Sequence, residues 1–367
     1  MHIVGGLLVA CVVSFLSTPF VKTLAYKIGA IDVPKDNRRM HKTPIPRLGG
    51  LAIFIAFILS ALLFAEIDRQ MRGILLGALV IVILGAIDDS HTLKAAPKFL
   101  VQIAAAGIAV SHGCVIQFIS NPNVFSATTY LNLGWISYPL TIFWIVAITN
   151  AVNFIDGLDG LAVGVSGIST ASLLVIALMV GEKNVAILLA ALLGSCIGFI
   201  PYNLNPAKIF MGDTGATFLG YMMACLSVQG LFKLYAIISF AVPFLILGVP
   251  IFDICFAVIR RVAHGQSPMQ ADRGHVHHRL IDSGFNQKQT VGITYMLTAL
   301  LGLAAVVLTT SGEMRALILI GSILLVGGIG VGVIFHEPKT TAEEEPDRPA
   351  PSEEQSDAEN ETEEDRS

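Results

Sequence analysis

Residues 161–202 decide the fold of this chain: they read LAVGVSGISTASLLVIALMV, then GEKN, then VAILLAALLGSCIGFIPY. Each apolar run is long enough to cross a bilayer as an α-helix, for which about 20 residues suffice. Backbone N–H and C=O groups find no water inside lipid, so a segment of this kind must satisfy them internally as a helix. The stretch therefore predicts two adjacent membrane-spanning helices joined by a short polar turn.

The rest of the chain repeats this pattern. Of its 367 residues, 54% are apolar and 14% are charged, and the mean hydropathy is +0.72. An ordinary soluble domain is about 45–50% apolar and about 25% charged, so one water-soluble core cannot bury this much apolar surface. The runs are continuous rather than alternating with a period of two, which excludes an outer-membrane β-barrel. We predict an all-α polytopic membrane protein with about eleven spans, at residues 3–25, 49–67, 73–88, 98–118, 138–155, 161–180, 184–202, 214–230, 235–258, 291–310 and 316–335.

The C-terminal residues 337–367 differ in composition from everything before them. They hold 13 Asp or Glu and 3 Lys or Arg, with many Pro and Ser and almost nothing apolar. A segment that buries so little apolar surface cannot offset its ordering entropy. We therefore predict a disordered acidic tail after a membrane domain at residues 1–336. Without the tail, the chain has 20 basic and 14 acidic residues, a net charge of +6.

The basic residues predict the orientation of the spans, because loops rich in Lys and Arg stay in the cytoplasm. With the N-terminus outside, the inner segments hold 18 of the 23 basic residues and the outer segments hold 5; omitting the tail leaves 15 against 5. We therefore place the N-terminus outside, and the long polar loops and the C-terminus in the cytoplasm. The first span has its basic residues after it, as an uncleaved anchor does and a signal peptide does not.

Polar residues cluster at the inner ends of the predicted spans, and ionisable side chains at membrane depth mark functional sites by default. In the first cluster, Asp88 and Asp89 end one span, and Lys94 and Lys98 precede the next. Adjacent carboxylates repel each other, so this pair predicts a nearby cation or basic partner. The alternative is a plain solvated loop.

The second cluster is NAVNFIDGLDGL at residues 150–161. Asn150, Asn153, Asp156 and Asp159 recur every third residue at the end of an apolar run, which places successive members on neighbouring helical positions. Hard oxygen ligands of this type suit Mg²⁺, whereas an EF-hand for calcium has a different spacing. A capped helix end followed by a glycine turn is the alternative.

The third cluster is FMGDTG at residues 210–215, where a lone carboxylate enters an apolar span. Asp213 is either a helix N-cap or a metal ligand, with Phe210 as a stacking face. The residues alone favour neither interpretation.

The fourth cluster lies in the loop at residues 260–288. Imidazole binds zinc and copper, but the flanking arginines would repel a cation and there is no HExxH helix. A cationic loop fits an anionic phosphate or sugar phosphate better; a surface loop with incidental histidines is the alternative. The residues concerned are Arg273, His275, His277, His278 and Arg279.

Together, the inner face offers a hard-metal site, phosphate-binding cations and spare carboxylates beside a lipid phase. That combination is typical of phosphoryl chemistry between a soluble nucleotide-type substrate and a lipid phosphate. The chain has no GxxxxGK[ST] loop, so an ATP-driven P-loop machine is not indicated. We expect the lipid bilayer as a partner and no nucleic acid.

At these four clusters the chain resembles the polyprenyl-phosphate N-acetylhexosamine-1-phosphate transferases. Within them it is most similar to the WecA/TagO-like branch, which uses UDP-GlcNAc and is related to the MraY translocase. The likeness runs from about residue 30 to residue 290 and rests on the DD…K element at 88–98, NAVNFIDGLDGL, FMGDTG and HVHHRL at 275–280, in the family's order. The early loop around Arg47 also looks like the family's first inner loop, whereas the acidic tail lies outside the family pattern.

The resemblance implies an enzyme of the bacterial inner membrane. It would transfer GlcNAc-1-phosphate from UDP-GlcNAc to undecaprenyl phosphate, giving undecaprenyl-pyrophosphoryl-GlcNAc and UMP. This reaction is the first step of a cell-envelope glycopolymer such as teichoic acid or O-antigen. Mg²⁺, or Mn²⁺ in its place, would be the cofactor, and a homodimer is compatible with the chain.

The matched motifs also imply roles for single residues. Asp213 would bind Mg²⁺ with the help of Asn153. Phe210 would stack on uracil, Asp159 would help to recognise the uridine, and Lys98 would contact phosphate. Asp88, Asp89 and Asp156 are the candidate catalytic carboxylates, of which the first two would position or deprotonate the lipid phosphate. The other predicted substrate-binding residues are Arg47, Asn150, Arg273, His275, His277, His278 and Arg279.

Two alternatives stay open. Relatives that transfer phospho-MurNAc-pentapeptide, or another N-acetylhexosamine-1-phosphate, share the carboxylate motifs, although the former carry a different histidine loop. An ion-coupled secondary transporter would show inverted repeats with paired broken helices and midplane sites. The clusters of this chain lie at the inner ends of spans instead, and its two halves show no convincing match.

Overall fold

The computed structural model describes residues 1–33, 43–120, 130–230, 241–263, 265, 275–310 and 321. The acidic tail, the predicted last span apart from residue 321, and Arg273 lie outside the described residues.

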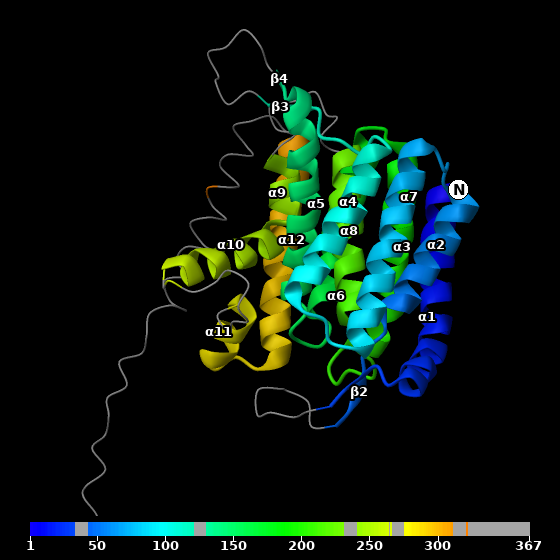
Figure 1. The fold of residues 1–367 in the computed structure, drawn as a ribbon, viewed down its shortest axis with the longest axis vertical. Coiled ribbons are helices and arrows are strands. Elements are labelled where there is room, and N and C mark those ends of the chain that lie inside the picture. The colour runs from blue at the N-terminus through cyan, green and yellow to red at the C-terminus, as the bar shows by residue number, and fades with distance from the viewer. Residues whose placement is uncertain are drawn as a thin grey trace, which may run out of the picture.

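The described chain is a bundle whose helices mostly run side by side along one axis (Figure 1). Six helices are long and apolar enough to cross a membrane, and two apolar helices are shorter. These findings confirm an all-α, multi-pass architecture, whereas the number of eleven spans stays a prediction. The bundle helices are α1 (His2–Ile28), α2 (Gly50–Phe64), α3 (Arg69–Ser90), α4 (Ala95–Ser111), α5 (Ser137–Phe154), α6 (Leu161–Met179), α7 (Lys183–Asn203), α8 (Gly212–Gly230) and α12 (Gln287–Thr310).

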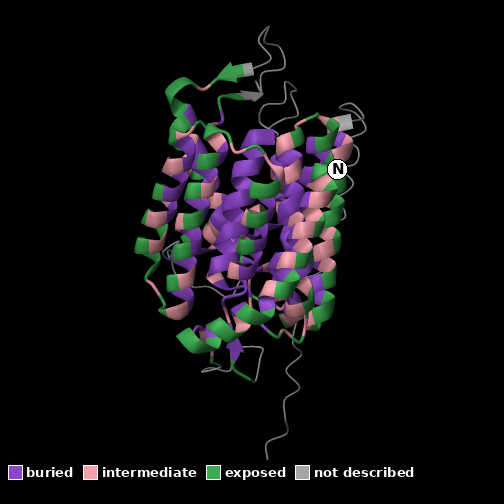
Figure 2. Ribbon diagram, turned by 90° about the vertical axis from the view of Figure 1, so that its right-hand side faces the viewer, coloured by how far each residue is buried: buried purple, intermediate pink, exposed green. Residues whose placement is uncertain are grey.

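Helix α8 is the centre of the bundle. Every residue from Thr214 to Gly230 is buried, and the helix packs against α3 and α5. Around it the buried residues form a continuous core, while the outward faces of the surrounding helices are exposed (Figure 2). Large apolar side chains on those faces, such as Leu8 and Phe20 of α1, are more than half exposed, as expected for a surface that contacts lipid.

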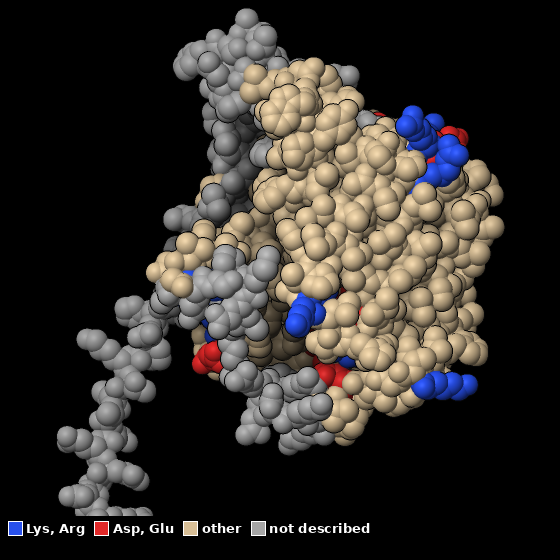
Figure 3. Space-filling view, viewed as in Figure 1, with Lys and Arg blue, Asp and Glu red and all other residues tan. Residues whose placement is uncertain are grey.

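The charged side chains gather toward the two ends of the molecule, with a broad uncharged surface between them (Figure 3). This distribution fits a bilayer around the middle of the bundle, because charges inside hydrocarbon are costly. The N-terminus lies at one end, and the β1–β2 pair lies at the other (Figure 1).

Two small antiparallel sheets lie at the ends of the bundle. Strands β1 (Ile31–Asp32) and β2 (Ile45–Pro46) pair after α1, and β3 (Phe118–Ser120) pairs with β4 (Tyr130–Asn132) before the short helix η1 (Gly134–Ile136) and α5. Strand β2 also contacts the segment before α8. The Phe210 N–H donates a hydrogen bond to the Pro46 carbonyl at 2.8 Å.

The predicted single span at residues 235–258 is wrong in its described part. The chain forms α9 (Ala241–Ile246), breaks at Leu247, and continues as α10 (Gly248–Ala263), which runs across the bundle axis (Figure 1). Pro250 has no N–H to donate to the Ile246 carbonyl, so a continuous helix would lose that bond. The Ser169 hydroxyl donates to this carbonyl instead, at 2.9 Å. A short helix, α11 (Val276–Asp282), then leads to α12.

Candidate active site

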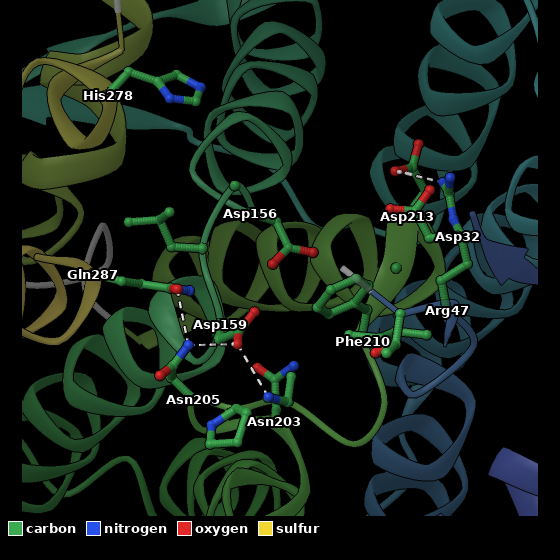
Figure 4. Close-up of a pocket in the computed structure, with 17 residues that line it drawn as sticks. Asp32, Arg47, Asp156, Asp159, Asn203, Asn205, Phe210, Asp213, His278 and Gln287 are labelled. Atoms are coloured by element: carbon green, nitrogen blue, oxygen red, sulfur yellow. Dashed lines mark hydrogen bonds and ion pairs between the residues drawn. The ribbon is translucent and has the colours of Figure 1, made fainter. Parts of the chain in front are cut away.

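A cleft of about 480 Å³ opens at the end of the bundle that carries β1 and β2. Its walls come from distant parts of the sequence: β1, the α5–α6 loop, the segment between α7 and α8, the first residues of α8, and the starts of α11 and α12. In Figure 4, Asp156 points toward the middle of the cleft, with Arg47 and Asp213 on one side and His278 on the other. Residues from the second, third and fourth sequence clusters line this cleft, and Asp89 and Lys98 of the first cluster are bonded to Asp213 in its wall.

Asp89 anchors the first turn of α8 to α3. Its carboxylate accepts hydrogen bonds from the Asp213 N–H at 2.9 Å, from the Thr214 N–H at 3.0 Å and from the Thr214 hydroxyl at 2.6 Å. A negative charge at a helix N-terminus also interacts favourably with the helix dipole. Gly212, at a φ of 70°, lies so close that an added Cβ would meet this carboxylate. Asp89 of the Asp88–Asp89 pair thus holds the first turn of α8, which carries Asp213.

Two cations neutralise part of the acidic cluster. Arg47 donates from Nε to Asp89 at 3.1 Å, and its Nη2 lies 3.8 Å from Asp213. Lys98 donates to Asp88 at 2.7 Å and also to Asp213. Asp88 in turn accepts the Leu93 N–H at 2.7 Å. The basic partner expected for the Asp88–Asp89 pair is therefore present on both sides of it.

The α5–α6 loop adds Asp156, which lines the cleft and whose carboxylate forms no hydrogen bond with the described residues. Burial, and then repulsion by Asp213 and Asp89, raise the pKa of Asp156 to about 8. Burial acts to lower the pKa of Arg47, but the charges of Asp89 and Asp213 outweigh it, so that this pKa lies above its usual value. The negative charge of Asp89 and Asp213 contributes to both shifts, in second place after burial for Asp156.

A second carboxylate of the same loop, Asp159, is fixed by hydrogen bonds. It accepts from Asn205 Nδ2 at 2.9 Å and from the Ala207 N–H at 3.0 Å. Asn205 also donates to Gln287 at 2.8 Å, and Phe210 lines the same cleft. This wall presents an aromatic ring beside amide and carboxylate groups, which suits a planar, polar ligand.

The histidine cluster divides into one residue that faces the cleft and two that are buried. His278 lines the cleft, whereas His275 and His277 are 7% and 4% exposed. The His277 ring lies against Gly157, and its Nε2 has no hydrogen-bond partner among the described residues. Burial, and then the neighbouring His278, lower the pKa of His277 to about 3. His277 therefore packs against the α5–α6 loop and is not among the residues that line the cleft.

Several predicted residues lie near the cleft without lining it. Asn150 donates to Gln102 at 2.6 Å, Arg279 stacks over Phe256 at 5.2 Å, and Asn153 is not among the residues of the cleft wall. Their predicted roles toward a ligand stay predictions.

The structure adds further polar residues to those that the sequence singled out. Asn205 and Gln287 line the cleft, and Asp253 of α10 is bonded to the histidine segment. The signal for Asp253 was available, because a carboxylate inside a predicted span marks a functional position. Gln287 carries no such signal, since it starts a helix some distance beyond the histidines.

The donors available for a metal ion are oxygens. Among the described residues, no group of three or more His, Cys, Asp or Glu side chains is arranged to hold a metal ion. Asp156 and Asp213 are nevertheless two carboxylates that face one cleft and repel each other. Two carboxylates plus substrate phosphates are the usual ligand set for Mg²⁺.

The comparisons with known proteins agree with this geometry. The chain is 43% identical over 314 residues to the "Probable undecaprenyl-phosphate N-acetylglucosaminyl 1-phosphate transferase" of Bacillus subtilis (strain 168), covering 85% of this chain and 86% of the relative. The profile of glycosyl transferase family 4 matches residues 71–231. The chain belongs to this family.

More distant members of glycosyl transferase family 4 give the same picture. The "Decaprenyl-phosphate N-acetylglucosaminephosphotransferase" of Mycobacterium tuberculosis (strain ATCC 25618 / H37Rv) is 32% identical over 87% of this chain and 86% of its own length. The "Undecaprenyl-phosphate alpha-N-acetylglucosaminyl 1-phosphate transferase" of Escherichia coli (strain K12) is 28% identical over 77% of each chain. The resemblance drawn from the four motifs is thereby confirmed.

Proposed function

We propose that this protein transfers GlcNAc-1-phosphate from UDP-GlcNAc to undecaprenyl phosphate, giving undecaprenyl-pyrophosphoryl-GlcNAc and UMP. The single observation that carries this proposal is the cleft at one end of a membrane bundle, where residues of three motifs form the wall and the remaining motif is bonded to Asp213 through Asp89 and Lys98. The names of the relatives supply the substrate classes. By the class of this reaction, the protein is a membrane phosphotransferase.

The reaction needs no enzyme nucleophile. An oxygen of the lipid phosphate attacks the phosphorus that carries the sugar, and the bond from that phosphorus to the bridging oxygen of UMP breaks. UMP leaves with the electron pair of that bond. The lipid phosphate is already largely anionic at neutral pH, because the second pKa of a phosphate monoester is about 6. The protein must therefore orient two anions in line and offset their charge.

The geometry supports separate tasks for the carboxylates. We assign Asp89 to holding the first turn of α8, because three groups of Asp213 and Thr214 donate to it and its side chain is fully buried. Asp88 holds Lys98, whose ammonium we propose as a phosphate contact. Asp156 has no such bonded partner and remains the candidate for contact with the reacting phosphates.

We propose Mg²⁺, with Mn²⁺ as a substitute, at Asp213 and the neighbouring oxygens, with Asn153 assisting. Such an ion would supply charge neutralisation on the diphosphate as the bond to UMP breaks. The chain's donor set fits, because hard oxygens suit Mg²⁺ and the Asp213 side chain is 21% exposed. Asp213 also has Lys98 as a partner, which holds its carboxylate in place.

The nucleoside end of the donor fits the wall formed by Phe210 and Asp159. Phe210 offers a ring face for uracil, and Asp159 is held by Asn205 for contacts with the uridine. His278 lies on the far side of the cleft, where it can donate to phosphate or sugar oxygens. The buried His275 and His277 would support His278 rather than contact the ligand.

We propose that this end of the bundle faces the cytoplasm and that the N-terminus is outside, in a bacterial inner membrane. The charge asymmetry of the loops supports this orientation, and the N-terminus lies at the end opposite the cleft. The product would prime a cell-envelope polymer of the teichoic acid or O-antigen type. A homodimer stays a prediction, which a molar-mass measurement in detergent would test.

The test is UMP release by detergent-purified protein with undecaprenyl phosphate and Mg²⁺, comparing UDP-GlcNAc with UDP-MurNAc-pentapeptide and other UDP-N-acetylhexosamines. We expect UMP with UDP-GlcNAc alone. Release with another donor would keep the chemistry and overturn the assignment of the sugar. No UMP from any donor, in protein shown to be folded, would favour the ion-coupled transporter instead.

A further inference from the structure

A buried carboxylate outside the cleft holds the histidine segment in place. Asp253 of α10 is 2% exposed. One of its oxygens lies 2.7 Å from His275 Nδ1, and the other accepts the Val276 N–H at 2.7 Å. Val276 is the first residue of α11. A single side chain therefore binds both the ring and the backbone at the start of this helix.

These bonds connect α11 to the rest of the cleft wall. The His275 ring stacks on Phe154, the last residue of α5, with ring centres 5.7 Å apart. It also stacks on His277 at 5.8 Å, which in turn packs against Gly157. Asp253 thus fixes α11 against the loop that carries Asp156.

Helix α10 has opposite faces of different character. Phe252, Ile259 and Val262 are more than half exposed, whereas Asp253 and Arg261 are buried. The break before Pro250 turns this helix across the bundle, so that its polar face meets α11. Burying a carboxylate is unfavourable unless it is hydrogen-bonded, so packing alone gives no reason for an acidic residue at position 253.

We propose that Asp253 is a positioning residue for the donor substrate: by holding His275 and the Val276 amide, it sets α11 so that His278 faces the cleft. Asp253 does not line the cleft and acts through α11. The identity of the donor, UDP-GlcNAc, rests on the proposed function. The link between Asp253 and α11 does not depend on it.

The first experiment compares steady-state constants of the full-length enzyme with those of Asp253→Ala and Asp253→Asn. We expect Asp253→Ala to raise the KM for UDP-GlcNAc about ten-fold or more, the effect of losing a hydrogen bond to a charged group. The KM for undecaprenyl phosphate should stay unchanged. Asn can still accept the Val276 N–H, so Asp253→Asn should be affected less. Cys255→Ser, an exposed position on the same helix, is the matched control and should behave as the wild type.

A double-mutant cycle tests whether the effect passes through His278. If Asp253 only positions α11, then Asp253→Ala should have little further effect on the KM for the donor in a His278→Ala background. Full additivity of the two changes would overturn the proposal. A fall in kcat with both KM values unchanged would also overturn it, because that is the signature of a smaller folded fraction.

Hydrogen exchange of the amides at residues 276–283 gives a readout without catalysis. We expect faster exchange in Asp253→Ala, and to a lesser degree in Asp253→Asn, with the bundle helices unchanged. Unchanged exchange in α11 would refute the structural link. If the wild type instead releases no UMP while α11 still loosens in the variants, the proposed function fails and the link stands.

Discussion

Gly157 is the position at which a single methyl group should separate α11 from the catalytic loop. An added Cβ would overlap the His277 ring, which is 4% exposed. Gly157 is not among the residues with a left-handed φ, so alanine there causes no backbone strain. The whole cost of Gly157→Ala therefore falls on the contact with α11.

The expected cost is that of overpacking a filled site, about 1–3 kcal/mol, which corresponds to about 5- to 150-fold in an equilibrium constant. Because His278 shares α11 with His277, displacement of the segment should weaken donor binding. We expect the KM for UDP-GlcNAc to rise by about five-fold or more, measured by UMP release, with the KM for undecaprenyl phosphate unchanged.

Two further variants make this prediction refutable. In a His277→Ala background the ring is gone, so Gly157→Ala should cause no additional loss. Gly107→Ala in α4, where an added Cβ meets nothing within 4 Å, controls for the glycine-to-alanine change itself. A wild-type KM in Gly157→Ala, or an equal loss with and without the His277 ring, would show that α11 does not pack on this loop as described.

Three other predictions follow from the same geometry. Asp213→Asn should lower kcat by about 10²–10³-fold. If the UMP release of this variant depended on the Mg²⁺ concentration as that of the wild type does, Asp213 would not be a metal ligand. Thr214→Val loses a buried 2.6 Å hydrogen bond to Asp89, so its free energy of unfolding should fall by about 1.5–3 kcal/mol; thermal unfolding in detergent checks this, with Thr214→Ser expected to stay near the wild type. Burial and the repulsion by Asp213 and Asp89 hold the pKa of Asp156 at about 8, against about 3.9 in an unfolded chain. The folded metal-free protein therefore keeps a proton that the unfolded chain releases, and this contribution to stability is present below about pH 4 and lost as the pH rises through about 8. Thermal unfolding in a chelator between these pH values should show this decline in the wild type and not in Asp156→Asn; parallel curves would contradict it.

The sequence predicts the parts of the site that a contiguous motif carries. Asp156 and Asp159 line the cleft because they follow the end of a hydrophobic segment, where a polar group meets the aqueous phase, and Phe210 lies just before a later such segment. Their convergence also follows from one expectation, namely that the clusters share one side of the membrane. Motifs do not encode which members face inward, so the burial of His275 and His277 emerges only when the packing of α11 is known.

The break between α9 and α10 shows why other features of the fold could not be predicted from the sequence. Average hydropathy hides single interruptions, and residues 235–258 are apolar enough to suggest one span. Pro250 and Asp253 are the two residues that contradict such a span, the first through a missing donor and the second through charge. Both have partners far away in the sequence, Ser169 for the carbonyl that Pro250 leaves free and His275 for the carboxylate. Only tertiary structure reveals these partners.

The charge balance of the cleft explains why a membrane enzyme would collect so many carboxylates. Among the described residues, Asp88, Asp89 and Asp213 pair with two cations, Arg47 and Lys98, and Asp156 adds a fourth carboxylate to the same region. Both proposed substrates are anions, and such a cleft would repel them in a medium where charges interact more strongly than in water. The proposed divalent cation would remove this conflict, because it would supply positive charge against the excess. Asp213 and Asp156 would then serve to hold that ion, while Asp89 and Asp88 use their charge to hold Thr214 and Lys98 in position.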